Sequence, residues 1–290
     1  MFHLFCFGFG YSAGYLADHL SKKGWKISAT VRSKEKCKAL KAKNIDCQVF
    51  DGLAPLEKLC GLRHATHVLL SVPPGEDGDP VFNIHCDDLA KISNCIWVGY
   101  LSTTGVYGDA GGALVDETSP LLTQTPRGLR RVRSERLWLR ASKKYDLPIH
   151  IFRLAGIYGA GRSAIDQLRK GNARRIIKQG HLFSRIHVED IAAVIEASID
   201  KPRPGAIYNV CDDEPAMSSD VVKYAAFLMD AKLPPAISFN DESLSEMVRS
   251  FYSEHRRVDN SLIKFELGMK FKFPNYRLGL KAIKSNQISF

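Results

Sequence analysis

Apolar runs of strand length alternate with segments of helical period along the first 160 residues. The apolar runs are nearly continuous, which is typical of strands buried on both faces of a parallel sheet. Between them lie segments in which apolar residues share one helix face, as Leu16, Ala17 and Leu20 do. This order predicts an α/β fold with a doubly wound parallel sheet. The expected strands are residues 2–7, 25–31, 46–50, 65–72, 95–102 and 148–158.

The pattern changes after residue 160, where arginine-rich and mixed segments replace the regular alternation. Residues 186–200 form an amphipathic helix pattern, followed by a strand, a polar loop and a helix. We therefore expect residues 1–160 to form the main domain, with 186–210 returning to it. Residues 161–185 and 211–290 are expected to form a smaller C-terminal lobe that carries the substrate side.

A glycine-rich turn directly follows the first apolar run and opens the next helix. Residues 8–13 read Gly-Phe-Gly-Tyr-Ser-Ala, a G-x-G-x-x-A pattern. The first glycine permits a tight turn, the second lets the backbone approach a pyrophosphate, and the small third residue allows close helix packing. The helix N-terminus adds N–H donors and the positive end of its dipole. The turn predicts a dinucleotide site lined by Gly8, Gly10, Tyr11, Ser12 and Ala13.

The residues after the second expected strand indicate which dinucleotide binds. An NAD site usually has a carboxylate near this position, against the ribose hydroxyls. Here Arg32 and Ser33 come first, and no acid follows until Glu35. A guanidinium and a hydroxyl suit a 2′-phosphate, so NADP is favoured over NAD. The alternative is a solvated basic start of a helix.

The composition is typical of a globular protein with a packed core, but it does not identify a ligand. A hydrophobic fraction of 45% supports a packed core, and no apolar run is long enough for a membrane helix. The net charge of +10 favours anionic partners in general. The seven cysteines are scattered singly with no Cys-x-x-Cys pair, which argues against disulfides and a structural metal. We expect seven free thiols, no metal and a cytoplasmic location.

Five later segments resemble the extended short-chain dehydrogenases/reductases of the NAD-dependent epimerase/dehydratase superfamily. With the glycine turn, they cover residues 3 to 230 in the order the family shows. The resemblance implies a Rossmann-type domain with a smaller lobe closing over the nicotinamide end, and a homodimer is one expectation for such a chain. The segments are STTGVYG (102–108), VDETSPL (115–121), FRLAGIYGAGR (152–162), RIHVEDIA (185–192) and AIYNVCDDEP (206–215).

The resemblance also implies roles for individual residues. Thr103 falls where the family has its catalytic Ser or Thr, beside Ser102. Residues that follow the fourth strand would border the ribose and nicotinamide, and residues that follow the sixth would lie near the carboxamide. These are Ser71, Val72 and Pro73 in the first case, and Leu154, Ala155 and Gly156 in the second.

The stretch TPRGLRRVRSER (125–136) departs from the family pattern. The family expects Tyr-x-x-x-Lys followed by a Glu four residues later. Glu135 fits that Glu, which puts Arg127 and Arg131 in the Tyr and Lys positions. An arginine neither gives nor accepts a proton near neutral pH, but it can hold an anion or a ribose. The chain is therefore identified as a member of an atypical branch, with this acid–base pair replaced by an anion-binding face. The alternative is that both arginines face solvent or acidic neighbours.

Other residues give weaker signals for proton transfer. Tyr107 and Tyr158 stand in Tyr-Gly turns, for which a structural use is expected. His187 opens a helix and is expected to be a capping or core histidine. Asp212, Asp213 and Glu214 form a carboxylate cluster that is expected to be a solvated turn.

Three functions compete on these observations. The first is an NADP-dependent oxidoreductase or epimerase/dehydratase acting on an anionic or nucleotide-linked small molecule. The second is an NADP-binding sensor or scaffold without turnover. The third, a nucleic-acid binder using the basic helix, is disfavoured because the chain carries no RNA- or DNA-binding motif. We adopt the first, although the sequence leaves turnover itself undecided.

Overall fold

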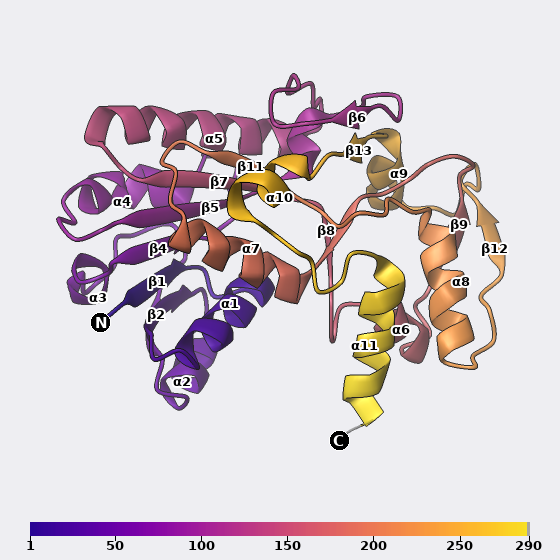
Figure 1. Ribbon diagram of the computed structural model, residues 1–290, viewed down its shortest axis with the longest axis horizontal. Coiled ribbons are helices and arrows are strands. Elements are labelled where there is room, and N and C mark those ends of the chain that lie inside the picture. Colours follow the sequence, from indigo (N-terminus) through magenta and orange to yellow (C-terminus); the bar gives the residue numbers. More distant parts are fainter. Residues whose placement is uncertain (289–290) are drawn as a thin grey trace. The chain divides into compact units, whose positions relative to one another are not determined.

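The computed structural model describes residues 1–288, and it contains a seven-stranded parallel sheet (Figure 1). The strand order is β11-β7-β5-β4-β1-β2-β3. The chain runs outward from β1 (His3–Phe7) through β2 (Lys26–Val31) to β3 (Asp46–Val49), then returns to β4 (His67–Leu70) on the other side of β1. The carboxyl ends of β1 and β4 therefore flank the point where the strand order reverses, which is where open α/β sheets bind ligands.

The first of two compact units contains the sheet and its covering helices. It comprises residues 1–106, 124–153 and 191–208. Figure 1 shows α4 and α5 on one side of the strands and α1 and α7 on the other. Besides β1 to β4, its elements are α1 (Tyr11–Ser21), α2 (Lys34–Lys41), α3 (Cys60–Arg63), α4 (Pro80–Ala90), β5 (Trp97–Thr103), α5 (Pro126–Tyr145), β7 (Ile149–Leu154), α7 (Val188–Asp200) and β11 (Ile207–Val210).

The second compact unit comprises residues 107–123, 154–190 and, of the described residues, 209–288. Its short parallel strand pairs join segments that are far apart in the sequence: β10 with β8, β12 with β9, and β13 with β6. Its elements are the 3-10 turn η1 (Thr104–Tyr107) at its boundary, β6 (Leu114–Val115), β8 (Gly156–Tyr158), α6 (Ala164–Arg169), β9 (Arg175–Ile177), β10 (Arg185–His187), α8 (Ser218–Leu228), β12 (Ala236–Ser238), α9 (Glu246–Ser253), β13 (Arg257–Val258), α10 (Ser261–Leu267) and α11 (Tyr276–Ile288).

The expected sheet is confirmed, but the expected sixth strand, 148–158, is divided. Its first part is β7 of the central sheet, and its second part is β8, which pairs with β10 in a separate sheet. The break lies at Ala155, whose N–H donates to Val210 O, while the next N–H, of Gly156, donates to Ser184 O. The second unit thus begins at residue 154, earlier than the expected 161, and also takes residues 107–123.

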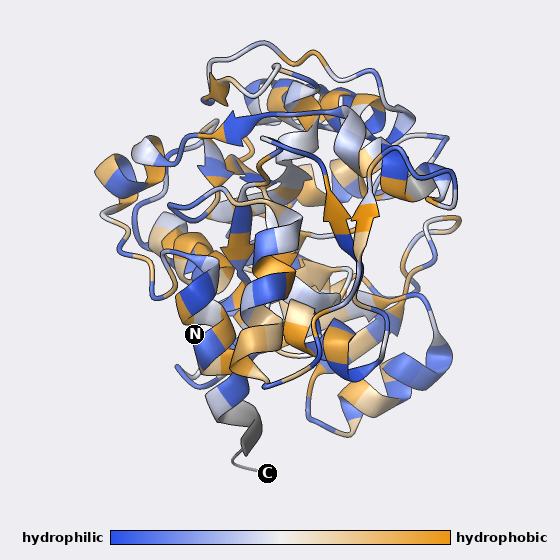
Figure 2. Ribbon diagram, turned by 90° about the vertical axis from the view of Figure 1, so that its right-hand side faces the viewer, coloured by the Kyte–Doolittle hydropathy of each residue, from blue (hydrophilic) through white to orange (hydrophobic). Residues whose placement is uncertain are grey.

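Apolar burial holds each unit together, as the continuous strand pattern predicts. Trp97, Tyr100 and Phe152 of the central strands are fully buried. In Figure 2 the helices alternate between hydrophobic and hydrophilic residues, as expected for helices with one face on a core. Within the described part of the chain, no helix combines the length and apolarity that crossing a bilayer requires.

Candidate functional site

The glycine-rich turn lies at the carboxyl end of β1, as the sequence predicts. Gly8 has a φ of +83°, which favours glycine, and its N–H donates to Thr30 Oγ1 at 2.9 Å. A Cβ on Gly8 would lie 3.1 Å from Val72 Cγ2 and 3.2 Å from the Val72 nitrogen. The structure therefore brings Gly8 together with Ser71 and Val72, which follow β4.

The start of α1 fits a dinucleotide pyrophosphate. Gly10 is the N-cap, and no side chain caps the helix. The first N–H groups of a helix have no partner within it, so they suit an anion. A Cβ on Gly10 would meet nothing within 4 Å, so the space beside this residue is open. These two observations together support the cofactor role expected for residues 8–13.

The segment after β2 is basic, as the sequence indicates, but its side chains are not equivalent. Arg32 is exposed. The Ser33 hydroxyl caps α2 by accepting a hydrogen bond from Lys36 N–H at 3.2 Å. The Lys36 ammonium donates to Phe9 O at 2.8 Å, in the middle of the glycine turn. Sequence reasoning missed Lys36, although its place in the first turn of α2 could have suggested it.

A buried ion pair lies behind the end of β5. Arg153 of β7 donates to Glu135 of α5 through Nε and Nη2, with the Nη2–Oε2 distance at 2.8 Å. Ser102 Oγ donates to the other carboxylate oxygen of Glu135 at 2.5 Å. All three residues are at most 5% exposed. The Ser102 hydroxyl, expected on the cofactor side, is thus directed toward Glu135, whereas half-buried Thr103 accepts a hydrogen bond from Gly105 N–H at 3.1 Å.

Arg127 and Arg131 have different environments although they share a helix. Arg127 is exposed in the first turn of α5. Arg131 is half-buried, and its Nη1 donates to Leu101 O at 2.6 Å and to the Tyr100 hydroxyl at 3.1 Å. The i, i+4 spacing alone suggested one shared anion-binding face, but Arg131 is hydrogen-bonded to β5.

The two tyrosines of the Tyr-Gly turns are buried. Tyr107 is 1% exposed, and its hydroxyl donates to Asn209 Oδ1 at 2.7 Å. Tyr158 is 8% exposed, and burial raises the pKa of its phenol. Burial also lowers the pKa of His187 to about 4, and its Nδ1 accepts a hydrogen bond from Glu189 N–H. The expected structural role is therefore confirmed for His187, and both phenols have structural partners.

The carboxylate cluster after β11 is not the solvated turn that was expected, because Asp212 is only 2% exposed. Its Oδ1 accepts a hydrogen bond from Glu214 N–H, while no described residue bonds its Oδ2. Burial raises the pKa of this carboxyl to about 8. Its two neighbours do form surface ion pairs, Asp213 with Lys264 and Glu214 with Arg277. The run of three acids hid this difference, because a polar sequence does not show which side chain points inward.

The remaining predicted residues follow β7. Leu154 and Ala155 are buried, whereas Gly156 is exposed. All three belong to the second compact unit. Among residues 1–288, no group of three or more His, Cys, Asp or Glu side chains is arranged to hold a metal ion. All seven cysteines are free.

Comparison with known proteins relates part of the chain to a family. Residues 88–211 match the model of the NAD dependent epimerase/dehydratase family. Protein YeeZ of Escherichia coli K12 is 27% identical over 283 residues, which cover 92% of this chain and 95% of that protein.

Solved structures of similar fold span the full length of the chain. A functionally unknown conserved protein from Silicibacter pomeroyi is 48% identical with a TM-score of 0.91, and 99% of each chain is covered. The dTDP-glucose 4,6-dehydratase of Bacillus anthracis in complex with NAD is 15% identical with a TM-score of 0.79, covering 99% of this chain and 98% of that one. The UDP-glucuronic acid 4-epimerase of Bacillus cereus in complex with NAD is 16% identical with a TM-score of 0.75, covering 98% and 99%. The two enzymes show that the fold is shared.

Asp212 gives the protein a testable pH dependence. Its pKa is higher in the folded state than the ordinary 3.8, so the folded protein holds this proton more tightly than the unfolded chain does. The free energy of unfolding that the protonated group contributes is therefore lost as pH rises from about 4 to about 8. Asp212→Asn keeps the Oδ1 acceptor and removes the titration. We expect the variant to gain stability over the wild type between pH 5 and pH 8, by about 1.4 kcal/mol per pH unit at most. Urea unfolding at both pH values measures the gain.

The matched control is Asp213→Asn, which changes an exposed carboxylate beside the buried one. This control should show little change in stability between the two pH values, since surface ion pairs contribute about 0 to 1 kcal/mol. A constant difference between Asp212→Asn and the wild type across this range would contradict the assignment.

Proposed function

We propose that the protein is an NAD(P)-dependent oxidoreductase or epimerase/dehydratase that acts on an anionic or nucleotide-linked small molecule. The observation that carries the proposal is the uncapped start of α1 beside the open face of Gly10. The match of residues 88–211 to the epimerase/dehydratase family model supports it, as do the nucleotide-sugar enzymes of similar fold. The free thiols support a cytoplasmic location.

The cofactor would supply hydride transfer, and the chain's own residues would bind and orient it. The backbone of residues 8–13 would hold the pyrophosphate, with Ser71, Val72 and Pro73 along the ribose and nicotinamide side. Leu154, Ala155 and Gly156 would lie toward the carboxamide. Thr103, at the end of β5, would offer its hydroxyl to the substrate oxygen.

Arg127 replaces the usual phenol in this proposal, so its function there is binding. Its guanidinium stays charged at neutral pH and can take a carboxylate or phosphate in a bidentate pair. Its exposure at the start of α5 keeps it accessible. The phenols of Tyr107 and Tyr158 are buried, so neither is proposed as the proton donor in place of the usual phenol.

Turnover is tested by monitoring NADPH and NADP absorbance with a panel of nucleotide sugars and carboxylated carbonyl compounds. The proposal predicts a substrate-dependent absorbance change, or conversion of the sugar detected by mass spectrometry when hydride returns to the product. Arg127→Ala should lower kcat/KM for anionic substrates about 10- to 100-fold, the usual effect of losing a charge-assisted hydrogen bond. Arg133→Ala, an exposed arginine elsewhere on α5, is the control. Tight cofactor binding without any turnover would favour the NADP-binding sensor or scaffold instead.

We further propose that NADP is preferred over NAD, because no carboxylate occupies the ribose position after β2 and Arg32 is exposed there. Lys36 adds a second cation at the glycine turn. Wild-type protein should bind NADPH at least tenfold more tightly than NADH, and Arg32→Ala should remove most of that difference. Fluorescence titration with both cofactors measures it. Lys41→Ala, at the far end of α2, should change neither affinity, and equal wild-type affinities would exclude the preference.

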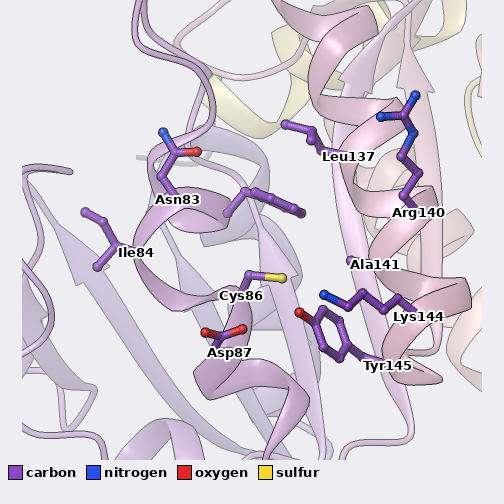
Figure 3. Close-up of a pocket in the computed structure, with 10 residues that line it drawn as sticks. Asn83, Ile84, Cys86, Asp87, Leu137, Arg140, Ala141, Lys144 and Tyr145 are labelled. Atoms are coloured by element: carbon purple, nitrogen blue, oxygen red, sulfur yellow. The ribbon is translucent and has the colours of Figure 1, made fainter.

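The chain also offers a surface for a homodimer. A pocket of about 590 Å³ lies between α4 and α5, and Figure 3 shows Asn83 and Ile84 on one side with Arg140 and Lys144 on the other. Asp87 on α4 is opposite in charge to Arg140 and Lys144 on α5. In a two-fold symmetric interface, the acidic side of the groove on one copy can face the basic side on the other copy. We therefore propose that two copies pair through this groove.

Charge exchange tests the dimer. Arg140→Glu should reduce the mass in solution toward the monomer, because it places like charges opposite Asp87, and adding Asp87→Arg should restore the dimer. Analytical ultracentrifugation measures the mass. Arg136→Glu, an exposed change outside the groove, should leave it unchanged. A monomeric wild type would refute the proposal.

A further inference from the structure

The inner face of α5 bonds to the rest of its unit through polar side chains at successive turns. Arg131, Glu135 and Trp138 stand at i, i+4 and i+7, so they share one helix face. Arg131 donates to Leu101 O, and Glu135 accepts from Ser102. The indole of Trp138 donates to Asp79 Oδ2 at 3.0 Å. Two of these contacts reach consecutive residues of β5, immediately before Thr103.

The carbonyl of Leu101 in β5 lies beyond the last residue pair that β5 forms with β4. The last β4–β5 pair in register is Leu70 with Tyr100. Val98 N–H bonds to Pro148 O, on the β7 side, and backbone groups of a strand alternate in direction, so Leu101 O points toward β4. Leu101 is only 6% exposed, and a buried carbonyl without a partner is costly. The 2.6 Å bond from Arg131 Nη1 supplies that partner.

The charge of Arg131 is also balanced within its own unit. Its guanidinium lies 5.6 Å from the centre of the Tyr100 ring, a distance typical of a cation–π contact. Asp79 is 1% exposed, and the charge of Arg131 partly offsets the effect of burial on the pKa of its carboxyl. Arg131 therefore has an acceptor, an aromatic face and a nearby carboxylate without any ligand.

We propose that Arg131 is a positioning residue that holds the carboxyl end of β5, and that Arg127 alone of the two arginines contacts the anionic ligand. Arg131 holds Leu101 by a hydrogen bond to the Leu101 carbonyl, and Glu135 holds Ser102 by a hydrogen bond from the Ser102 hydroxyl. The backbone that carries Thr103 is thereby held at two consecutive residues. The ligand half of this inference rests on the proposed function, whereas the positioning half does not.

Hydrogen exchange on the ligand-free protein tests the positioning half. Arg131→Met keeps much of the length of the side chain and removes its donors, so amides of residues 101–105 should exchange about 10- to 100-fold faster. Amides of β2 should be unchanged. Arg131→Lys should retain most of the protection, because an ammonium can still donate to Leu101 O. Arg127→Met, the matched control on the same helix, should leave residues 101–105 at wild-type rates.

Binding of NADPH and of inorganic phosphate, measured by calorimetry, tests the ligand half. Arg127→Met should weaken phosphate binding at least tenfold, and Arg131→Lys should stay within about threefold of the wild type for both ligands. If Arg131→Met does not fold, Arg131→Lys carries the comparison. The inference is overturned if Arg131→Lys loses phosphate affinity as Arg127→Met does, or if Arg131→Met leaves exchange at residues 101–105 unchanged. A wild type that binds neither ligand would refute the proposed function, and the exchange result would still decide the role of Arg131.

Discussion

The ion pair between Glu135 and Arg153 is the interaction on which the rest of the candidate site depends. It joins α5 to β7 in the interior of the first unit and takes the Ser102 hydroxyl of β5 as a third member. Two charges buried at this depth cost several kcal/mol each in desolvation, and mutual pairing with full hydrogen bonding offsets that cost. Losing one partner of such a pair typically costs about 3 to 5 kcal/mol, so the contact fixes α5 relative to the strand ends that border the site.

The two ends of this site rely on different physics. At the glycine turn, backbone geometry matters, because Gly8 has a positive φ and lies close to Val72, so a side chain there would be strained. The uncapped helix start offers N–H groups to an anion. At α5, side-chain charge matters, since Arg127 is exposed in the first turn of the helix and Arg131 bonds to the carbonyl of Leu101. A glycine turn that fits a pyrophosphate and an exposed arginine on α5 support the proposed binding of an anionic substrate more directly than proton transfer.

Much of the fold and the cofactor end could be read from the sequence, because both follow from local pattern. Continuous apolar runs predicted the parallel strands, and the glycines predicted a turn that needs a positive φ at Gly8. The single expected strand 148–158 was wrong in its second half, since the apolar pattern continues through Ala155 while its hydrogen-bond partners change. Lys36 was missed because its ammonium reaches the glycine turn across 27 residues of sequence.

The sequence by itself determined the order of elements, the glycine turn, the basic segment after β2 and the arginines of α5. Each is a property of residue type and spacing. Tertiary structure alone decided that Arg131 turns to the carbonyl of Leu101, that Ser102 turns to Glu135 and that Asp212 is buried while its neighbour Asp213 is exposed. Those outcomes depend on which polar groups are left without partners after the strands pair. The local sequence does not encode that, because the partners come from distant parts of the chain.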